Sequence, residues 1–438
     1  MLPKTPLRNT KGMIGMNYFE LNKEQLLKEK EALLEKYEEY KSLKLALNMA
    51  RGKPAPAQLD LSQGLLTAFE GRDCFYKGED CRNYGNLRGL SGMTELFAEL
   101  FGLPEKQIYI GASSSLNLMF DTFARNMISG AYKGATPWGQ QGKIKFLCPC
   151  PGYDRHFSIA QTFGLELIPV DMTPTGPDMD QVEELIKDPA VKGIWCVPKY
   201  SNPTGITFSD ETVRRFAALN PAADDFRIFW DEAYELHDLY EEHDELLNLY
   251  SELEKTGKTN MAYFFASFSK VTFAGAGIAM MASGKENMDY AIGIISMQTI
   301  GNDKINQLSH LHFFESAEAV HEHMKKHAKI LRPKFEKVLE IFDRELAARG
   351  IGSWTSPKGG YFISLDLPEG TATRTYQLAK GLGVTLTPVG ATFPYGKDPR
   401  DSNLRIAPSF PSIEELALAT ECLTVCARLA TAEKLLEG

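Results

Sequence analysis

The first part of the chain carries the pattern of an amphipathic helix. Residues 18–48 are rich in Glu, Lys and Leu and contain neither Pro nor Gly. Leu26, Leu33 and Tyr37 recur at the spacing of one helix face. Residues 51–54 (Arg-Gly-Lys-Pro) then interrupt the pattern, because Gly and Pro disfavour a helix interior. The sequence therefore predicts one helix followed by a break.

Between residues 144 and 283, short apolar runs alternate with amphipathic stretches such as 211–219. The runs are continuous rather than alternating, which is typical of strands buried on both faces. This order predicts an α/β fold with a largely parallel sheet covered by helices. The predicted strands are 144–148, 165–170, 193–197, 226–230, 263–268 and 278–282.

The last part of the chain predicts a smaller α+β unit. Residues 319–349 carry a long helical pattern. Strand-like segments at 359–364 and 404–407 follow, with a helix expected from about Thr373. No internal repeat interrupts this organisation.

Composition restricts the kinds of partner. The chain of 438 residues is 43% hydrophobic and 24% charged, which is ordinary for a soluble protein. Its net charge of -9 argues against nucleic-acid binding, which needs a basic face. No apolar run approaches the length of a membrane span, and the start has no signal-peptide pattern. Seven cysteines without a CxxC pair favour a reducing compartment, so we expect a cytoplasmic protein.

Five histidines lie between positions 310 and 327. His323 and His327 are four residues apart, a spacing that makes a metal site conceivable on a helix. No Cys or paired carboxylate joins them in a known ligand pattern. We therefore expect a solvated helix face and no metal.

Polar residues follow four of the predicted strands. Ligands of open α/β sheets bind beyond the carboxyl ends of the strands, so these residues should share one crevice. In the order of the chain they are Tyr153, Asn202, Asp231 with Tyr234, and Lys270.

Lys270 is the most informative of them. It closes the apolar run 263–268 just after Ser269, and lysine is rarely buried without a partner or a chemical role. An amine in this position suits a Schiff base with an aldehyde. Upstream, the small residues 111–115 lead into a helical pattern, where free backbone N–H groups form a ready phosphate site.

An amine, a carboxylate, a stacking aromatic and a phosphate cup together suit pyridoxal phosphate (PLP). The chain resembles the fold-type I PLP-dependent aminotransferases of the aspartate aminotransferase-like superfamily, from about residue 52 to 405. The motifs that carry the resemblance are Ser-Asn-Pro-Thr-Gly at 201–205, Asp-Glu-Ala-Tyr at 231–234 and Ser-Phe-Ser-Lys at 267–270. It implies a large PLP-binding domain at 51–318. Residues 1–50 would be the helical N-terminal part of a small domain, and 319–438 its C-terminal part.

The resemblance implies roles for five residues at the cofactor ring. Lys270 corresponds to the lysine that forms the Schiff base and later moves the proton. Asp231 corresponds to the carboxylate that pairs with the pyridine nitrogen and makes the ring a better electron sink. Asn202 and Tyr234 correspond to donors to the phenolic oxygen, and Tyr153 to the aromatic that stacks on the ring.

Other correspondences concern the phosphate and the substrate. Ala112, Ser113 and Ser267 correspond to phosphate contacts. Tyr84 corresponds to a tyrosine that reaches the phosphate of the neighbouring subunit. Arg405 corresponds to the clamp on the substrate α-carboxylate, and Gly52 to a glycine that lines the substrate. Taken singly, Tyr84 also fits a half-buried aromatic, and Arg405 fits a salt-bridge residue.

The chain departs from the family after Lys270. Most members carry a phosphate-binding arginine seven or eight residues later, where this chain has Gly277 and Ile278. Hydroxyls, amides and the helix dipole, or a cation from elsewhere, must then hold the phosphate. For a distal carboxylate the family position falls on Lys304, which equally fits a helix-surface lysine.

Together, the motifs predict a homodimeric aminotransferase that acts on aspartate and 2-oxoglutarate by a ping-pong mechanism. Alternatives are an aminotransferase for alanine and glyoxylate or for aromatic donors, and a PLP-dependent lyase. A PLP-binding regulatory module is a further alternative. No basic DNA-reading segment precedes the helix at 18–48, which argues against it.

Overall fold

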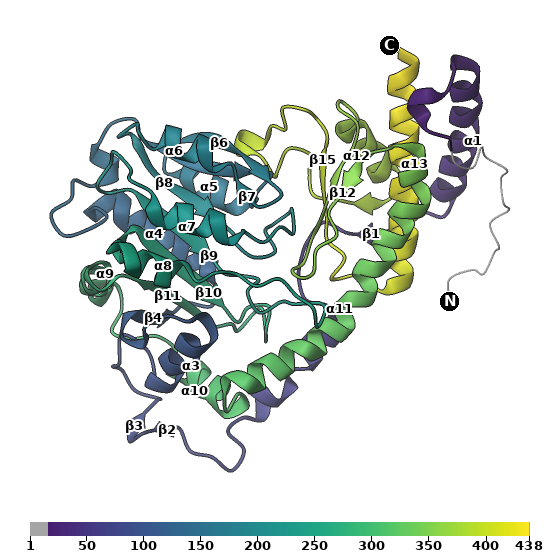
Figure 1. Ribbon diagram of the computed structural model, residues 1–438. Helices are drawn as coiled ribbons and strands as arrows, with labels where there is room; N and C mark the ends of the chain where they lie inside the picture. The colour runs from purple at the N-terminus through teal and green to yellow at the C-terminus, as the bar shows by residue number, and fades with distance from the viewer. Residues whose placement is uncertain (1–15, 438) are drawn as a thin grey trace.

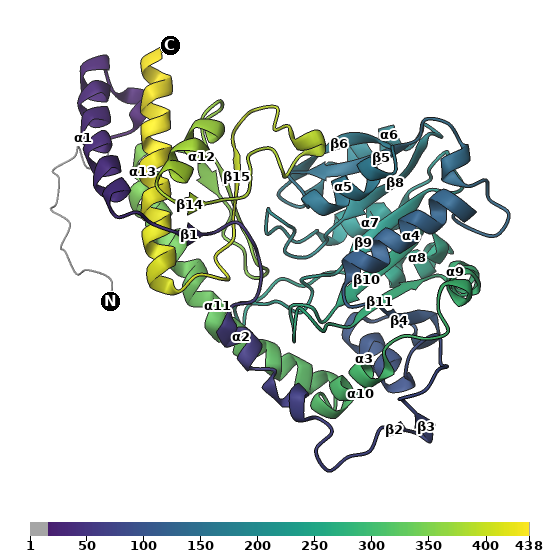
Figure 2. The same ribbon diagram turned by 180° about the vertical axis from the view of Figure 1, so that it is seen from behind.

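The computed structural model describes residues 16–437, which form a large and a smaller domain. The long helix α11 (Ala317–Glu345) runs from the large domain to the small one (Figure 1). Seen from behind, helix α1 (Lys23–Ser42) lies beside the C-terminal helix α13 (Ile413–Glu437) at the outer edge of the small domain (Figure 2). Within the described residues, no helix is both long enough and apolar enough to cross a membrane.

The large domain is built on an eight-stranded sheet. From β10 to β6 neighbouring strands run parallel, whereas β11 pairs antiparallel with β10 and with β4. The strands, in their order across the sheet, are β4 (Ile108–Gly111), β11 (Ala279–Ser283), β10 (Ala262–Ser267), β9 (Arg227–Asp231), β8 (Val191–Cys196), β5 (Lys145–Cys150), β6 (Glu166–Thr173) and β7 (Gly176–Pro177).

The observed strands confirm the α/β fold. Each of the six predicted strands is present, with ends that differ by at most three residues. The edge strands β4 and β7 were not predicted. Both faces of the sheet are buried, because Ile228 and Trp230 of β9 enter one hydrophobic core and Phe229 enters another. The continuous apolar pattern reflects this two-sided burial.

Helices cover the sheet on both faces. On one face lie α4 (Ser115–Ser129), α5 (Asp154–Thr162) and α9 (Lys285–Gln298). On the other lie α3 (Ser91–Phe101), α6 (Met179–Leu185), α7 (Asp210–Ala218), α8 (Leu249–Thr256) and α10 (Lys304–Phe313).

The small domain combines helices with short strands. Helix α13 packs against α1, α11 and α12 (Ala372–Gly381). A three-stranded sheet contains β12 (Ser353–Trp354), β13 (Ile363–Asp366) and β15 (Asn403–Ile406), and β1 (Leu47–Asn48) pairs with β14 (Val384–Thr385). The domain boundaries themselves stay a prediction. The ribbon of β2 (Phe75–Tyr76) and β3 (Glu79–Asp80) and the short helix α2 (Pro56–Asp60) complete the α-helices and strands.

The expectation of a solvated histidine face is wrong. His310, His323 and His327 are buried, whereas His321 is exposed. His323 Nε2 lies 2.9 Å from the carbonyl oxygen of Val271 and 3.2 Å from His327 Nε2. His323 and His327 therefore contact each other, and His323 also contacts a backbone carbonyl. His310 lies 2.9 Å from both Thr272 Oγ1 and the Asn306 carbonyl oxygen. These polar contacts make the burial of the rings tolerable. Among the described residues, no group of three metal-binding side chains forms.

Candidate functional site

Asp231 is the last residue of β9 and sits at the carboxyl end of the sheet. Its side chain is only 3% exposed. Oδ2 lies 3.2 Å from His156 Nε2, while Oδ1 has no hydrogen-bond partner among the described residues. A buried carboxylate oxygen without a partner is costly, so this oxygen indicates a place for a donor.

His156 fixes the orientation of Asp231. Its ring stacks on Trp195 with centroids 4.5 Å apart and an angle of 14° between the planes. Sequence reasoning did not select His156. The sequence feature that could have indicated His156 is its position three residues after Tyr153, in the first turn of α5.

Lys270 follows β10 and points into the same region. Its Nζ lies 4.8 Å from the centre of the Tyr234 ring. Burial lowers the pKa of Lys270, and the nearby Asp231 carboxylate opposes this shift. A lowered pKa leaves more of the amine neutral, which is the nucleophilic form.

Asp231, Tyr234 and Lys270 line one cavity of about 160 Å³ at the carboxyl ends of the strands. Five of the predicted ring and phosphate residues line it: Tyr153, Asn202, Asp231, Tyr234 and Ser267. Lys270 lines it as well, together with Ser114, Ser115, Leu116, Met119, Val197, Ala233 and Ser269. The sequence-predicted convergence of amine, carboxylate and aromatic is thus present in the fold.

Two of the residues predicted to contact the phosphate immediately precede two residues that line the cavity. Ala112 and Ser113 do not line the cavity, whereas Ser114 and Ser115 do. Ser114 caps α4 by accepting a hydrogen bond from Asn117 N. The amino end of α4, with its partial positive charge, therefore faces the cavity.

Arg405 lies on β15 beside this cavity, with a side chain 9% exposed. Its Nη1 donates to Asp154 Oδ1 at 3.0 Å and to Asn202 Oδ1 at 3.2 Å. The guanidinium also lies 4.9 Å from the centre of the Phe362 ring. Because Asn202 both accepts this hydrogen bond and lines the cavity, it connects Arg405 to the cavity.

Gly52 packs against the same aromatic ring. A Cβ atom at position 52 would lie 2.4 Å from Phe362 Cζ. Only glycine fits this close approach. The backbone around Gly52 therefore belongs to the surroundings of Arg405.

Comparison with known proteins decides the family. The model of the family described as "Aspartate amino-transferase" matches residues 21–438. The chain belongs to this family. An aspartate aminotransferase of Corynebacterium glutamicum is 45% identical over 405 residues, which cover 92% of this chain and 94% of the relative. This membership makes the chain an aminotransferase.

Solved structures agree with this assignment. The crystal structure of an aspartate transaminase from Corynebacterium glutamicum has a TM-score of 0.93 and 44% identity, covering 96% of this chain and 99% of that one. The α-aminoadipate aminotransferase of Thermus thermophilus, complexed with N-(5'-phosphopyridoxyl)-L-leucine, shares the fold. Its TM-score is 0.70 at 22% identity, and the match covers 90% of this chain and 93% of that chain.

Family membership implies PLP as the cofactor, and the cavity fits it. The unpartnered Oδ1 of Asp231 suits a protonated ring nitrogen. Lys270 supplies a half-buried amine, and Ser114, Ser115 and Ser267 supply hydroxyls along the lining.

Glycine at position 277, where the family resemblance predicts an arginine, has a steric explanation. A Cβ atom on Gly277 would lie 2.5 Å from the carbonyl oxygen of Ser113 and 2.9 Å from Ser269 Oγ. Ser269 Oγ itself donates to that carbonyl at 2.8 Å. The segment after Lys270 thus packs directly on the loop before α4, and this approach leaves no room for an arginine at Gly277.

Tyr84 and Lys304 lie together, away from the lining of the cavity. Tyr84 is 81% exposed. Lys304 is 3% exposed, pairs with Glu79 and lies 3.3 Å from the carbonyl oxygen of Tyr84. Within one chain, the Lys304 ammonium is therefore neutralised by Glu79.

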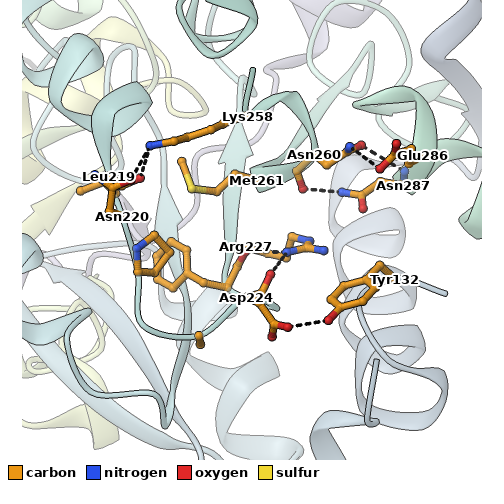
Figure 3. A pocket seen from close by; sticks show the side chains of 13 residues that line it. Tyr132, Leu219, Asn220, Asp224, Arg227, Lys258, Asn260, Met261, Glu286 and Asn287 are labelled. Carbon is orange, nitrogen blue, oxygen red and sulfur yellow. Dashed lines mark hydrogen bonds between the residues drawn. The ribbon is translucent and has the colours of Figure 1, made fainter. Parts of the chain in front are cut away.

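A larger cavity of about 420 Å³ opens at the amino ends of β9 and β10 (Figure 3). Its polar groups mostly satisfy one another: Tyr132 donates to Asp224 at 2.6 Å, and Lys258 donates to the carbonyl oxygen of Leu219 at 2.8 Å. As far as the described residues show, none of the sequence-predicted site residues lines it. Size alone therefore does not identify the functional site.

Proposed function

We propose that this aminotransferase uses PLP to transfer the amino group of L-aspartate to 2-oxoglutarate. The observation that carries the proposal is that half-buried Lys270 and buried Asp231 line one cavity, beside Arg405. Similarity to an aspartate aminotransferase over nearly the whole chain supports the choice of substrate.

The residues of the cavity would hold the cofactor at three points. Lys270 would hold it covalently through its amine. Asp231, oriented by His156, would keep the ring nitrogen protonated. Hydroxyls of Ser114, Ser115 and Ser267, with the amino end of α4, would bind the phosphate in place of an arginine.

Three further side chains would position the ring. Asn202 and Tyr234 line the cavity and would donate to the phenolic oxygen, and Tyr153 would stack on the ring face. Burial raises the pKa of Tyr234 well above its ordinary value. Tyr234 therefore remains a hydrogen-bond donor at every physiological pH.

When bound, PLP supplies an electron sink for the electron pair left at Cα of the amino acid. Side chains of the protein would bind the substrate, orient it and move the proton. Arg405 would bind the α-carboxylate and so orient the Cα–H bond toward Lys270. Lys270, once replaced by the substrate amine, would take the proton from Cα as a general base. The buried walls of the cavity would exclude water from this step.

A single cavity favours a ping-pong mechanism. The amino acid and the 2-oxo acid both carry an α-carboxylate for Arg405, so they would bind in succession. An aminotransferase for other donors needs the same residues, and a PLP-dependent lyase does too.

We further propose a cytoplasmic homodimer. Tyr84, exposed in the single chain, would reach the phosphate of the neighbouring active site. The seven cysteines are free, as a reducing compartment requires. Lys304 would meet a distal carboxylate only if Glu79 released it.

Steady-state kinetics with a panel of donors and acceptors tests the proposal. We expect continued turnover of aspartate to oxaloacetate, beyond one equivalent per site, only when 2-oxoglutarate is present, with parallel lines in double-reciprocal plots. Sedimentation of the purified protein as a dimer is expected in the same preparation. Release of ammonia and pyruvate without an acceptor would instead identify a lyase. A preference for alanine or aromatic donors would contradict the aspartate assignment.

A further inference from the structure

Beside the cavity, Arg405 alone offers too little positive charge for a dicarboxylic substrate. Aspartate and 2-oxoglutarate each bring a second carboxylate, and Arg405 already shares its charge with Asp154. Lys304 is paired with Glu79 and buried. A further cation is therefore needed near Arg405.

Arg51 lies between two backbone positions that are fixed to the Arg405 site. On one side, the carbonyl oxygen of Ala50 accepts a hydrogen bond from Thr387 Oγ1 at 2.8 Å, and Arg405 Nη2 donates to that same oxygen of Thr387 at 3.1 Å. On the other side, Gly52 packs on Phe362, the ring beneath Arg405. The Cα atom of Arg51 is thereby held at the edge of the substrate site.

The Arg51 side chain is exposed and forms no ion pair or hydrogen bond with the described part of the chain. Its neighbour Lys53 is also exposed, but the Lys53 ammonium lies 3.8 Å from the centre of the Phe410 ring. Arginine presents a planar fork that matches a carboxylate with two parallel hydrogen bonds. Arg51 therefore has both the freedom and the chemistry to bind one.

We infer that Arg51 binds the distal carboxylate of the substrate from within the same subunit and selects dicarboxylic donors and acceptors. This inference rests on the proposed function and names the residue that determines its specificity. Lys304, held by Glu79, then has a structural role.

Paired kinetics with aspartate and alanine test the inference. In Arg51→Met, kcat/KM for aspartate should fall about 30- to 100-fold, the range expected for one lost charge-assisted hydrogen bond. The value for alanine should change less than about threefold, because alanine has no distal carboxylate. Arg51→Lys should recover part of the loss, since the charge returns without the fork.

Arg155→Met is the matched control, and Lys304→Met tests the rival candidate for the distal carboxylate. Arg155 is an exposed cation on α5 beside Asp154, so its removal lowers the local charge equally. Neither variant should lose aspartate selectively. A selective loss in either of these variants, or an equal loss for aspartate and alanine in Arg51→Met, overturns the inference.

Calorimetric titration of the cofactor-loaded protein provides a reading independent of turnover. Succinate should bind Arg51→Met about 30- to 100-fold more weakly than wild type, whereas propionate binding should change little. Unchanged succinate affinity would refute the role of Arg51. Aspartate turnover by the wild type tests the proposed function itself, and the ratio between variants tests Arg51 alone.

Discussion

Replacing Asp231 with asparagine removes one charge from the centre of the site and keeps the shape of the side chain. Oδ2 bonds His156 at 3.2 Å, and Oδ1 has no partner among the described residues. In the loaded enzyme, Oδ1 would face the protonated ring nitrogen of the cofactor. The substitution therefore removes the anionic partner of a buried cation.

The size of the loss in kcat follows from the burial of Asp231 and of its neighbour His156. The Asp231 and His156 side chains are 3% and 1% exposed, so solvent does little to screen the interaction. Breaking a buried ion pair from one side costs about 3–5 kcal/mol. Since each 1.36 kcal/mol is tenfold in rate, kcat for aspartate should fall about 150- to 5,000-fold. The apoprotein should unfold within about 1 kcal/mol of wild type, because Oδ1 has no partner to lose.

Asp225→Asn is the matched control at the opposite end of the sheet. Asp225 is also 3% exposed, and it pairs with Lys192 Nζ at 2.8 Å. Its substitution leaves a buried ammonium unpaired, so it should destabilise the fold by about 3–5 kcal/mol and leave kcat unchanged.

Calorimetric unfolding of the apoproteins and kcat at saturating aspartate and PLP measure both quantities. An Asp231→Asn variant that keeps kcat within threefold of wild type would refute the reasoning. So would a loss of kcat that Asp225→Asn reproduces.

Three further outcomes are expected. Arg405→Lys should lower kcat/KM about 10- to 200-fold for every amino donor, because a lysine cannot form the bidentate pair; a loss confined to dicarboxylic donors would contradict this role. Asp231→Asn should lower the pKa of Lys270 further, because the carboxylate raises that pKa. Acetylation of Lys270 in the apoprotein, followed by mass spectrometry, should then begin at lower pH. Acetylation that begins at higher pH would contradict the stated effect of Asp231. Arg428→Met should cost about 3–5 kcal/mol in urea unfolding because Glu29, 2.6 Å away, becomes a buried unpaired charge; an unchanged midpoint would contradict it.

The parallel sheet could be predicted because its strands are apolar on both faces. Trp230 and Phe229 are adjacent in the chain and enter opposite cores, so burial leaves a continuous apolar run. β4 was missed because four residues between Gln107 and a serine-rich turn give too short a pattern. Polar residues at the strand ends could be placed together because the carboxyl ends of parallel strands meet at one edge of the sheet.

Partners that depend on distant contacts could not be predicted. His156 acquires its role from Trp195 and Asp231, which are far away in the sequence. The buried histidines looked solvent-exposed because polarity alone does not reveal an acceptor such as the carbonyl oxygen of Val271. The glycine at 277 reflects a close backbone approach that only the folded chain shows.

The central claim is that Lys270 holds the cofactor, and borohydride reduction tests it most directly. Borohydride converts the bond between the cofactor and its lysine into a stable amine, which peptide mass spectrometry locates. The account predicts the phosphopyridoxyl mass on Lys270, and none on the buried lysines Lys192, Lys199, Lys304 and Lys334. Labelling of another lysine, or of no lysine in a protein with bound PLP, would contradict it.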